Sequence, residues 1–394
     1  MKVALVSPYD WHTPGGVNAH VGPLADQLRL LGHEVRVLAP ASRPVADPDV
    51  ITIGRPLPVH ASGSVVRISL NPRLGRQVRE VLERERFDVV HMHEPLMPVL
   101  PIQVLRHSRA ANPGVVNVGT FHARKDGGNR LYSYGRRLLK RWFRELDGKI
   151  AVSPPAAQYV ERYFPGYYNI IPNGIDVAHW ANPELQPIPE LDDGLTNILF
   201  VGRAEKRKGL GYLLRAFGVV NARHPATRLI VVGPDSRARR RYRASVERSG
   251  RRGVVWVDGP SYDELPRYHR TADVFCSPAT SHESQGYVLL EAMAAGLPVV
   301  ASNIEGYASV ITHGVEGLLV HPRDAIDLAN GLTALVRDAD RRAALAAAGR
   351  HRVEEYSWPH VSQQVISYYE RLVDQQRHYR RVHHAAVARR APAR

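Results

Sequence analysis

The pattern that most limits the fold of this chain is a strand, a glycine-containing loop, a helix and a second strand in immediate succession. A helix that joins two neighbouring strands in this way makes them parallel, which is typical of doubly wound α/β domains. The first copy comprises a strand over residues 3–6, a loop with Gly15 and Gly16, an amphipathic helix over 21–31 and a strand over 34–39. Further strands are predicted over residues 89–93, 115–120 and 149–153.

The same order of elements begins again near residue 197, which predicts a second domain. Its strands are expected over residues 197–202, 229–233, 254–257, 274–277 and 299–301. A chain of 394 residues is also longer than one hydrophobic core usually covers. We therefore predict α/β domains over residues 1–172 and 173–355. A helix over residues 356–376 is expected to cross back to the first domain, and residues 377–394 to form a basic, disordered tail.

The charge of the chain favours anionic partners. The 53 Lys and Arg residues outnumber the 38 Asp and Glu residues and give a net charge of +15. Such an excess attracts nucleic acids, anionic lipid headgroups or phosphorylated substrates. The single cysteine, Cys276, excludes an internal disulfide and a cluster of thiolate metal ligands. No apolar run is long enough for a signal peptide or a membrane span, so we expect a cytoplasmic protein.

Two carboxylates near the second glycine-rich region are candidate ligands for a sugar. Glu283 and Glu291 are separated by seven residues, so both face one cleft if the intervening segment is helical. A carboxylate suits sugar hydroxyls because it accepts two hydrogen bonds at fixed geometry. The alternative is an exposed loop glutamate followed by a glutamate near a helix start, where the helix dipole favours it.

Cations and glycines after the first strand of each domain are candidate phosphate ligands. Arg203, Lys206, Arg207 and Lys208 follow the strand over 197–202 and could hold a diphosphate, although such a run also suits a solvated loop. Gly15 and Gly16 follow the first strand, where backbone amides bind anions, and otherwise form a tight turn. Their spacing does not match the glycine fingerprint of nicotinamide-binding domains.

His122 follows another predicted strand, at the end where α/β proteins bind ligands. His91 and His93 alternate along one strand, but few acids lie near them, so a zinc site is not expected. Residues 129–146 form a basic amphipathic segment with Trp and Phe. That segment could lie in a membrane interface or pack on its own domain with a solvated basic face.

Taken together, these motifs resemble the retaining glycosyltransferases of family 4. The resemblance extends from Gly15 to Trp358, and its most specific parts are the run from Ile171 to Asp176, Gly202 with Arg203, Lys208 with Gly209, and the pair Glu283 and Glu291. It implies the GT-B fold, in which two Rossmann-like domains face each other. Within the family, the chain is most similar to the phosphatidylinositol mannosyltransferases of bacteria.

The resemblance also implies roles for individual residues. His122, Arg203, Lys208 and Glu283 would be catalytic. The donor would be bound by Gly15, Gly16, Arg203, Lys208, Glu283, Ser284, Gly286 and Glu291, with Arg203 and Lys208 on the diphosphate, Glu283 on the transferred sugar and Glu291 on the ribose. The acceptor would be bound by Tyr9, Arg67 and His122.

The implied reaction is transfer of mannose from GDP-mannose to phosphatidylinositol with retention of the anomeric configuration. No cofactor or metal is required, with a divalent cation as a stimulant at most. The implied partners are a nucleotide sugar and an anionic lipid surface rather than nucleic acid. The protein is expected to act as a monomer or weak oligomer at the inner face of the cell membrane.

The acceptor region departs from the pattern of those mannosyltransferases. Ser62 stands where an Asn is expected, and residues 123–130 replace a loop rich in Thr and Ser. A family 4 enzyme that uses a UDP-sugar with a diacylglycerol or polysaccharide-precursor acceptor therefore stays open. So do a nucleotide-sugar epimerase on the same fold and a basic nucleic-acid-binding protein.

Overall fold

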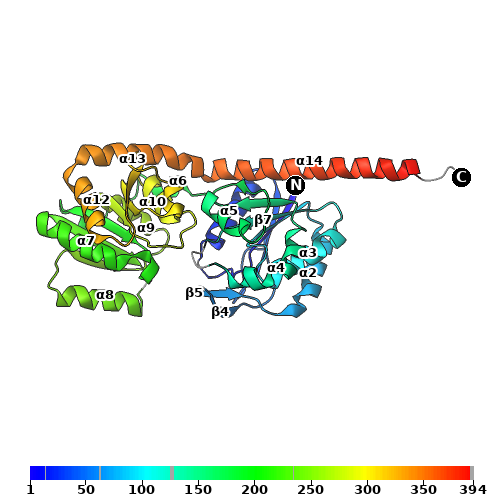
Figure 1. Cartoon of the computed structure of the whole chain (residues 1–394), viewed down its shortest axis with the longest axis horizontal. Coiled ribbons are helices and arrows are strands. Elements are labelled where there is room, and N and C mark those ends of the chain that lie inside the picture. Colours follow the sequence, from blue (N-terminus) through cyan, green and yellow to red (C-terminus); the bar gives the residue numbers. More distant parts are fainter. Residues whose placement is uncertain (14, 62–63, 125–127, 234, 391–394) are drawn as a thin grey trace. The chain divides into compact units, whose positions relative to one another are not determined.

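The computed structural model describes residues 1–13, 15–61, 64–124, 128–233 and 235–390. The chain divides into two compact units: unit 1 is Met1–Gly174 with Trp358–Arg394, and unit 2 is Ile175–Ser357 (Figure 1). Each boundary between the two units lies two residues later than the predicted domain boundary. The first follows residue 174 rather than 172, and the second follows residue 357 rather than 355. The departure at Ser62 and part of the loop over residues 123–130 lie outside the described residues.

Unit 1 contains a parallel sheet of seven strands in the order β3-β2-β1-β6-β7-β8-β9. The strands are β1 (Lys2–Val6), β2 (Glu34–Ala39), β3 (Val50–Thr52), β6 (Val89–His93), β7 (Val116–Phe121), β8 (Gly148–Ala151) and β9 (Asn169–Ile170). A separate antiparallel hairpin, which the sequence did not predict, pairs β4 (Leu57–Ala61) with β5 (Ser64–Ile68).

Helices cover both faces of this sheet, because its central strands are apolar on both sides. One core lies between the sheet and the helices α2 (Gly75–Glu85), α3 (Leu100–Ala111), α4 (Arg130–Phe143) and α5 (Pro154–Glu161). The other core lies under α1 (Asn18–Leu30) and α14 (Trp358–Arg390). In α1, Val21, Leu24 and Leu28 are buried at helical spacing, as the sequence pattern predicts.

Unit 2 repeats this architecture with a parallel sheet of six strands in the order β12-β11-β10-β13-β14-β15. The strands are β10 (Thr196–Val201), β11 (Thr227–Gly233), β12 (Val254–Asp258), β13 (Val274–Ser277), β14 (Val299–Ser302) and β15 (Gly317–Val320). Every ladder in it is parallel. β15 was not predicted.

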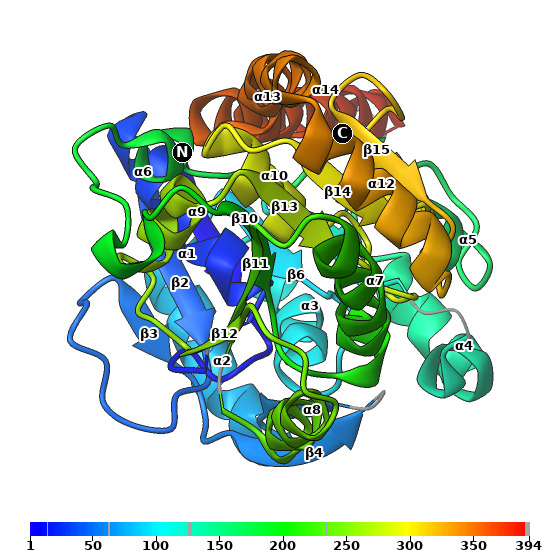
Figure 2. The same cartoon turned by 90° about the vertical axis from the view of Figure 1, so that its left-hand side faces the viewer.

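The sheet of unit 2 separates two helical layers (Figure 2). One core contains residues of α7 (Leu210–Arg223), α8 (Arg237–Arg248) and α12 (Ala325–Arg337). The opposite core contains residues of α6 (Val177–Ala181), α10 (Tyr287–Ala294), α11 (Glu305–Ala308) and α13 (Ala339–Val353), with α9 (Leu265–Thr271) packed against it. The two doubly wound domains that the repeat predicted are therefore present.

Helix α14 returns to unit 1 after the chain leaves unit 2. Val361, Val365 and Tyr369 are buried at successive turns of this helix, on the face that covers the first domain's sheet. A Cβ on Gly174 would lie 2.5 Å from the Trp358 ring, so only glycine allows the helix start to approach so closely. The prediction of a disordered tail from residue 377 was wrong up to Arg390, because the helix continues that far.

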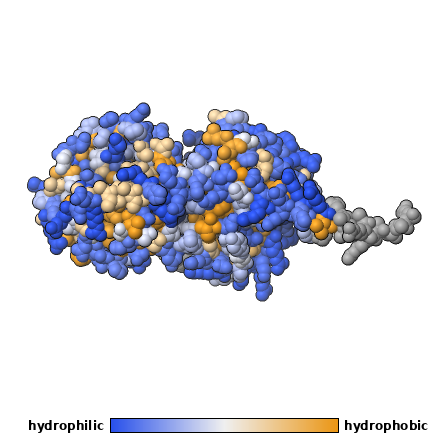
Figure 3. All heavy atoms as spheres, turned by 90° about the horizontal axis from the view of Figure 1, so that it is seen from above, coloured by the Kyte–Doolittle hydropathy of each residue, from blue (hydrophilic) through white to orange (hydrophobic). Residues whose placement is uncertain are grey.

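Hydrophilic side chains cover most of the face shown in Figure 3, and the apolar ones lie in small groups. Among the described residues, no helix has both the length and the apolar character needed to cross a membrane. Even α14, with 33 residues, is too polar for that role.

Candidate functional site

The strand order of unit 2 places the predicted cations and carboxylates at one point. β10 pairs with β11 on one side and with β13 on the other. The connection after β10 therefore runs toward one side of the sheet, and the connection after β13 runs toward the other side. In doubly wound sheets ligands bind at such a switch point, outside the carboxyl ends of the strands. The loop after β10 carries Lys208, and the loop after β13 carries Glu283.

These two side chains form an ion pair in the structure. Lys208 Nζ lies 2.7 Å from Glu283 Oε1, and Arg207 Nη1 lies 2.9 Å from the same oxygen. All three side chains are largely shielded from solvent, so the attraction is stronger than on an open surface. The group is an acid held between two cations, which can face both a sugar hydroxyl and a phosphate.

Arg207 was not given a role of its own by sequence reasoning, whereas Arg203 was. Arg203 is 56% exposed in its side chain and pairs with Glu205 at 3.0 Å. Glu205 in turn accepts from Arg207 Nε at 2.8 Å. Arg203 is thus linked to Glu283 through Glu205 and Arg207, by three ion pairs in a row. Only the fold could identify Arg207, because the sequence does not tell which of four neighbouring cations turns toward the carboxylate.

Glycine at position 209 allows the two loops to meet. Gly209 has φ of +75°, and a Cβ there would lie 1.8 Å from the carbonyl oxygen of Pro278. Beside this contact, the amide of Thr280 donates to the Arg207 carbonyl at 2.7 Å. A side chain at 209 would push apart the segments that hold Lys208 and Glu283.

Glu291 lies on α10, and residues 283–286 form the loop that precedes this helix. Gly286 caps the helix in the left-handed region, with φ of +91°. Burial raises the pKa of Glu291 to about 7, and the nearby charge of Lys208 acts against that rise. Lys208 therefore contacts one predicted carboxylate and acts electrostatically on the other. Ser284 lies in the same loop and is partly buried.

Unit 1 has its own switch point, between β1 and β6. The loop after β1 contains Gly15 and Gly16, and a Cβ on either would meet no protein atom within 4 Å. Space around these residues is open, so no packing contact requires glycine there. Asp10 fixes the start of the loop: it accepts from the Thr13 hydroxyl at 2.9 Å and from the Ser42 amide at 3.0 Å.

Two of the predicted acceptor residues are held together beside this loop. Tyr9 forms an antiparallel bridge with Ile68, and the amide of Asp10 donates to the carbonyl of Arg67 at 2.9 Å. Burial is the larger cause that raises the pKa of Tyr9 far above its ordinary value, and the charge of Glu94 adds to it. The side chain of Arg67 is exposed.

Glu94 is a structural support that sequence reasoning missed. It is only 4% exposed, and its Oε1 accepts hydrogen bonds from the amides of His122 and Ala123, both at 2.8 Å. Its φ of +54° is unusual for a residue other than glycine. Glu94 thus anchors the loop that begins at His122. The sequence signal that could have identified Glu94 was its position as a charged residue directly after the buried strand β6.

His122 is part of a buried group of four histidines, completed by His20, His91 and His93. His122 Nε2 lies 2.9 Å from His93 Nδ1, and the rings of His20 and His122 are 5.2 Å apart. Burial lowers the pKa of His91 to about 3 and that of His122 to about 4. These histidines are therefore neutral at pH 7. No group of described His, Cys, Asp and Glu residues is arranged to hold a metal ion.

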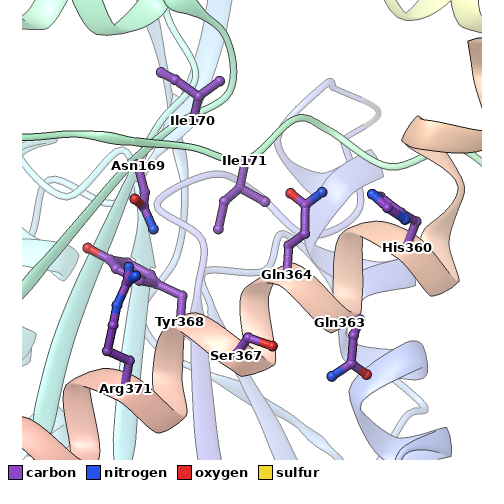
Figure 4. Close-up of a pocket in the computed structure, with 9 residues that line it drawn as sticks. All are labelled: Asn169, Ile170, Ile171, His360, Gln363, Gln364, Ser367, Tyr368 and Arg371. Carbon is purple, nitrogen blue, oxygen red and sulfur yellow. The ribbon is translucent and has the colours of Figure 1, made fainter.

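A hollow of about 360 Å³ in unit 1 has none of the predicted site residues in its lining. It lies between residues 169–171 and α14, with Gln364 and Tyr368 facing the strand segment (Figure 4). Its lining contains one cation, Arg371, and no carboxylate. The charged cluster of unit 2 offers both, so we take that cluster as the candidate site for sugar-phosphate chemistry.

The chain matches models of known protein families and curated relatives over most of its length. The family described as Glycosyltransferase Family 4 matches residues 14–179, and that described as Glycosyl transferases group 1 matches residues 182–352. A phosphatidyl-myo-inositol mannosyltransferase of Mycolicibacterium smegmatis is 37% identical over 373 residues, which cover 94% of each chain. One of Propionibacterium freudenreichii is 32% identical over 380 residues, again covering 94% of each chain.

Solved structures show the same fold at lower identity. A glycosyltransferase of Rickettsia africae has a TM-score of 0.76 at 18% identity and covers 94% of this chain and 98% of its own. HepE of Anabaena, solved in complex with UDP, has a TM-score of 0.74 at 19% identity and covers 94% of this chain and 100% of its own. The fold of this chain is thus GT-B.

Proposed function

We propose that this chain, which belongs to glycosyltransferase family 4, transfers mannose from GDP-mannose to phosphatidylinositol at a membrane surface. The observation that carries the proposal is the ion pair of Lys208 and Glu283 at 2.7 Å, at the switch point of the unit 2 sheet. The relatives named phosphatidyl-myo-inositol mannosyltransferase suggest the sugar and the acceptor.

The donor is assigned to the loops after β10 and β13. Lys208 has three N–H donors, so it can keep Glu283 and also reach a diphosphate oxygen. Arg207 can do the same through its unused guanidinium donors, and Arg203 supplies a third cation. Glu283 accepts hydrogen bonds from hydroxyls of the transferred sugar. Glu291 accepts from the ribose when it is ionised.

We propose the following reaction at these residues. The bond between C1 of the sugar and the diphosphate oxygen breaks, and the departing charge is stabilised by Lys208 and Arg207. An inositol oxygen forms the new bond to C1 on the same face, which retains the configuration. The hydroxyl proton passes to an oxygen of the leaving diphosphate. No cofactor is assigned to the step, and a divalent cation would act as a stimulant.

The acceptor is assigned to unit 1. Arg67 is exposed and lies beside Tyr9, so its guanidinium can pair with the phosphate of the lipid headgroup. His122 is assigned to the same headgroup. It is neutral at pH 7 and is held by His93 and by the Glu94 contact to its amide.

Membrane contact is assigned to the face of unit 1 covered by α2, α3 and α4. On α4, Tyr134 is 89% and Leu138 is 68% exposed, one helical turn apart, while Leu139 and Phe143 are buried on the opposite side. A second hollow on this face is lined by Arg73, Arg76, Arg79 and Arg106. Apolar side chains beside exposed cations are the combination that binds anionic lipid surfaces.

A reconstituted transfer assay tests the proposal. Vesicles that contain phosphatidylinositol are incubated with the enzyme and radiolabelled GDP-mannose, and lipid-bound mannose is measured with and without EDTA. We expect label in the lipid fraction under both conditions. Parallel reactions contain UDP-glucose in place of GDP-mannose, or diacylglycerol in place of phosphatidylinositol. Product only with UDP-glucose would replace the donor assignment, and product only with diacylglycerol would replace the acceptor assignment. Loss of product with EDTA would show that a metal ion is essential.

A further inference from the structure

A pair of stacked rings in unit 2, of which one is exposed and one half-buried, lies outside every role assigned so far. The rings of His179, on α6, and Tyr262, in the loop between β12 and α9, are 4.3 Å apart, and their planes differ by 6°. Tyr262 is 59% exposed although His179 stacks on one face of its ring, so much of the remaining side chain is accessible to a ligand. Single exposed aromatic rings are common on protein surfaces, so the surroundings of this ring decide what it can bind.

The surroundings hold this ring in a fixed orientation. Asp176 caps α6 by accepting from the His179 amide at 3.0 Å, and the His179 ring lies 3.3 Å from the Tyr262 carbonyl oxygen through Nε2. The buried Trp180 meets the Tyr262 ring edge-on at 5.8 Å. One face and one edge of the tyrosine are therefore occupied, and the other face is preorganised to receive a flat ligand.

The pair lies next to the carboxylate assigned to the ribose. Helix α6 packs against α10, which carries Glu291. Burial raises the pKa of the Tyr262 hydroxyl to about 12, and the charges of Glu291 and then Asp176 add to that rise. Lys208 acts on Glu291, and Glu291 acts on Tyr262, so Glu291 is the neighbour that the two share. Along these electrostatic interactions, Glu291 stands between the cation Lys208 and the aromatic ring of Tyr262.

This order matches that of a nucleoside diphosphate, in which diphosphate, ribose and base follow one another. We propose that Tyr262, backed by His179, is the stacking platform for the nucleobase of the donor. The inference rests on the proposed function for the diphosphate and ribose positions. It adds a side-chain contact that helps to set affinity for the base, because every base presents a flat π-face to such a ring.

Binding measurements with Tyr262→Ala and Tyr262→Phe test the platform. Isothermal titration calorimetry is run with GDP, UDP and inorganic pyrophosphate, and exposed Tyr167 in unit 1 is changed to Ala as the matched control. Base–aromatic stacking corresponds to about 5- to 150-fold in affinity. We expect Tyr262→Ala to weaken the preferred nucleotide by that factor and to leave pyrophosphate unchanged. Tyr262→Phe should stay within about twofold, since it keeps the ring.

The outcomes separate this inference from the proposed function. If Tyr262→Ala binds the nucleotide as tightly as the unchanged protein, the platform is wrong and the diphosphate assignment stands. If a folded Tyr262→Ala variant loses pyrophosphate binding as well, the residue shapes the diphosphate position and the platform is equally wrong. If the unchanged protein binds neither nucleotide nor pyrophosphate, the proposed function itself fails.

Discussion

At the scale of single residues, the chemistry of this chain depends on how charges are shared. Glu283 is held by two cations, and one of them, Lys208, also acts on the second carboxylate, Glu291. A substrate that brings two phosphates and several hydroxyls can add to these contacts, because Lys208 and Arg207 have further N–H donors. The cluster is therefore a site whose partners are already oriented before the donor arrives.

Replacement of Lys208 by Ala should lower kcat/KM for transfer by about 100-fold or more, because a preorganised cation at the leaving group is lost. Folding should survive, since Arg207 still neutralises Glu283. Lys206→Ala is the matched control, because Lys206 is an exposed cation in the same loop. The measurement is initial-rate kinetics together with the melting temperature. Unchanged kinetics in a folded Lys208→Ala variant would remove this residue from the site.

Nucleotide affinity should depend on pH through Glu291. Its pKa is raised to about 7, so the carboxylate, which we propose accepts hydrogen bonds from the ribose, forms as pH rises through that value. GDP should bind about tenfold more weakly at pH 6 than at pH 8, following the ionised fraction. The nucleotide phosphates also titrate, so part of the pH dependence of GDP affinity comes from the nucleotide. Glu291→Gln should remove the rest of that dependence. A variant with the full pH dependence would assign the titration to another group.

At the scale of elements, α4 joins two roles on opposite sides of one helix. Leu139 and Phe143 pack into the core of unit 1, while Tyr134 and Leu138 face solvent. The sequence left open whether this segment packs on its own domain or lies in a membrane interface. The packing is now seen, and the exposed stripe leaves the membrane contact as a testable proposal.

The double variant Tyr134→Ser, Leu138→Ser should bind anionic vesicles about tenfold more weakly, because two exposed apolar side chains no longer enter the lipid. Leu30→Ser, at the exposed end of α1, is the control. Co-sedimentation with vesicles gives the binding, and turnover of a short-chain, water-soluble phosphatidylinositol shows that the site is intact. Equal binding by both variants would place the membrane contact elsewhere.

At the scale of the whole molecule, the two units differ in how they should respond to acid. Unit 1 contains the four buried histidines, all with a pKa below the ordinary value because burial disfavours the charged form. Among the described residues of unit 2, His269 has the same property, with a pKa of about 4. Such groups take up protons on unfolding, so they lower stability as the pH falls.

The buried histidines destabilise the fold only in acid. The stability contribution is complete above about pH 6.5, the ordinary value for histidine, and it is lost as the pH falls toward the folded values of about 3 and 4. Each histidine contributes up to about 1.4 kcal/mol per pH unit within that range. Hydrogen exchange at pH 7.5, 6 and 5 should show protection falling more in β6 and β7 than in β10 and β11. His93→Gln should reduce this difference in protection between the two units, whereas the control His378→Gln, at an exposed histidine, should leave it unchanged. Equal losses of protection in both units would contradict the prediction.

The sequence by itself determined the fold class, the two parallel sheets and the chemical types at the site. Strand–glycine–helix order forces parallel pairing, and the carboxyl ends of parallel strands meet at one edge, so Lys208 and Glu283 could be expected together. Only the tertiary structure decided that Arg207 is among the neighbouring cations that turn toward Glu283. It also decided that Glu94 supports the backbone at His122. It also made the chain after residue 377 helical to Arg390. These outcomes depend on contacts between distant segments, such as Gly209 against Pro278, and no local pattern encodes them.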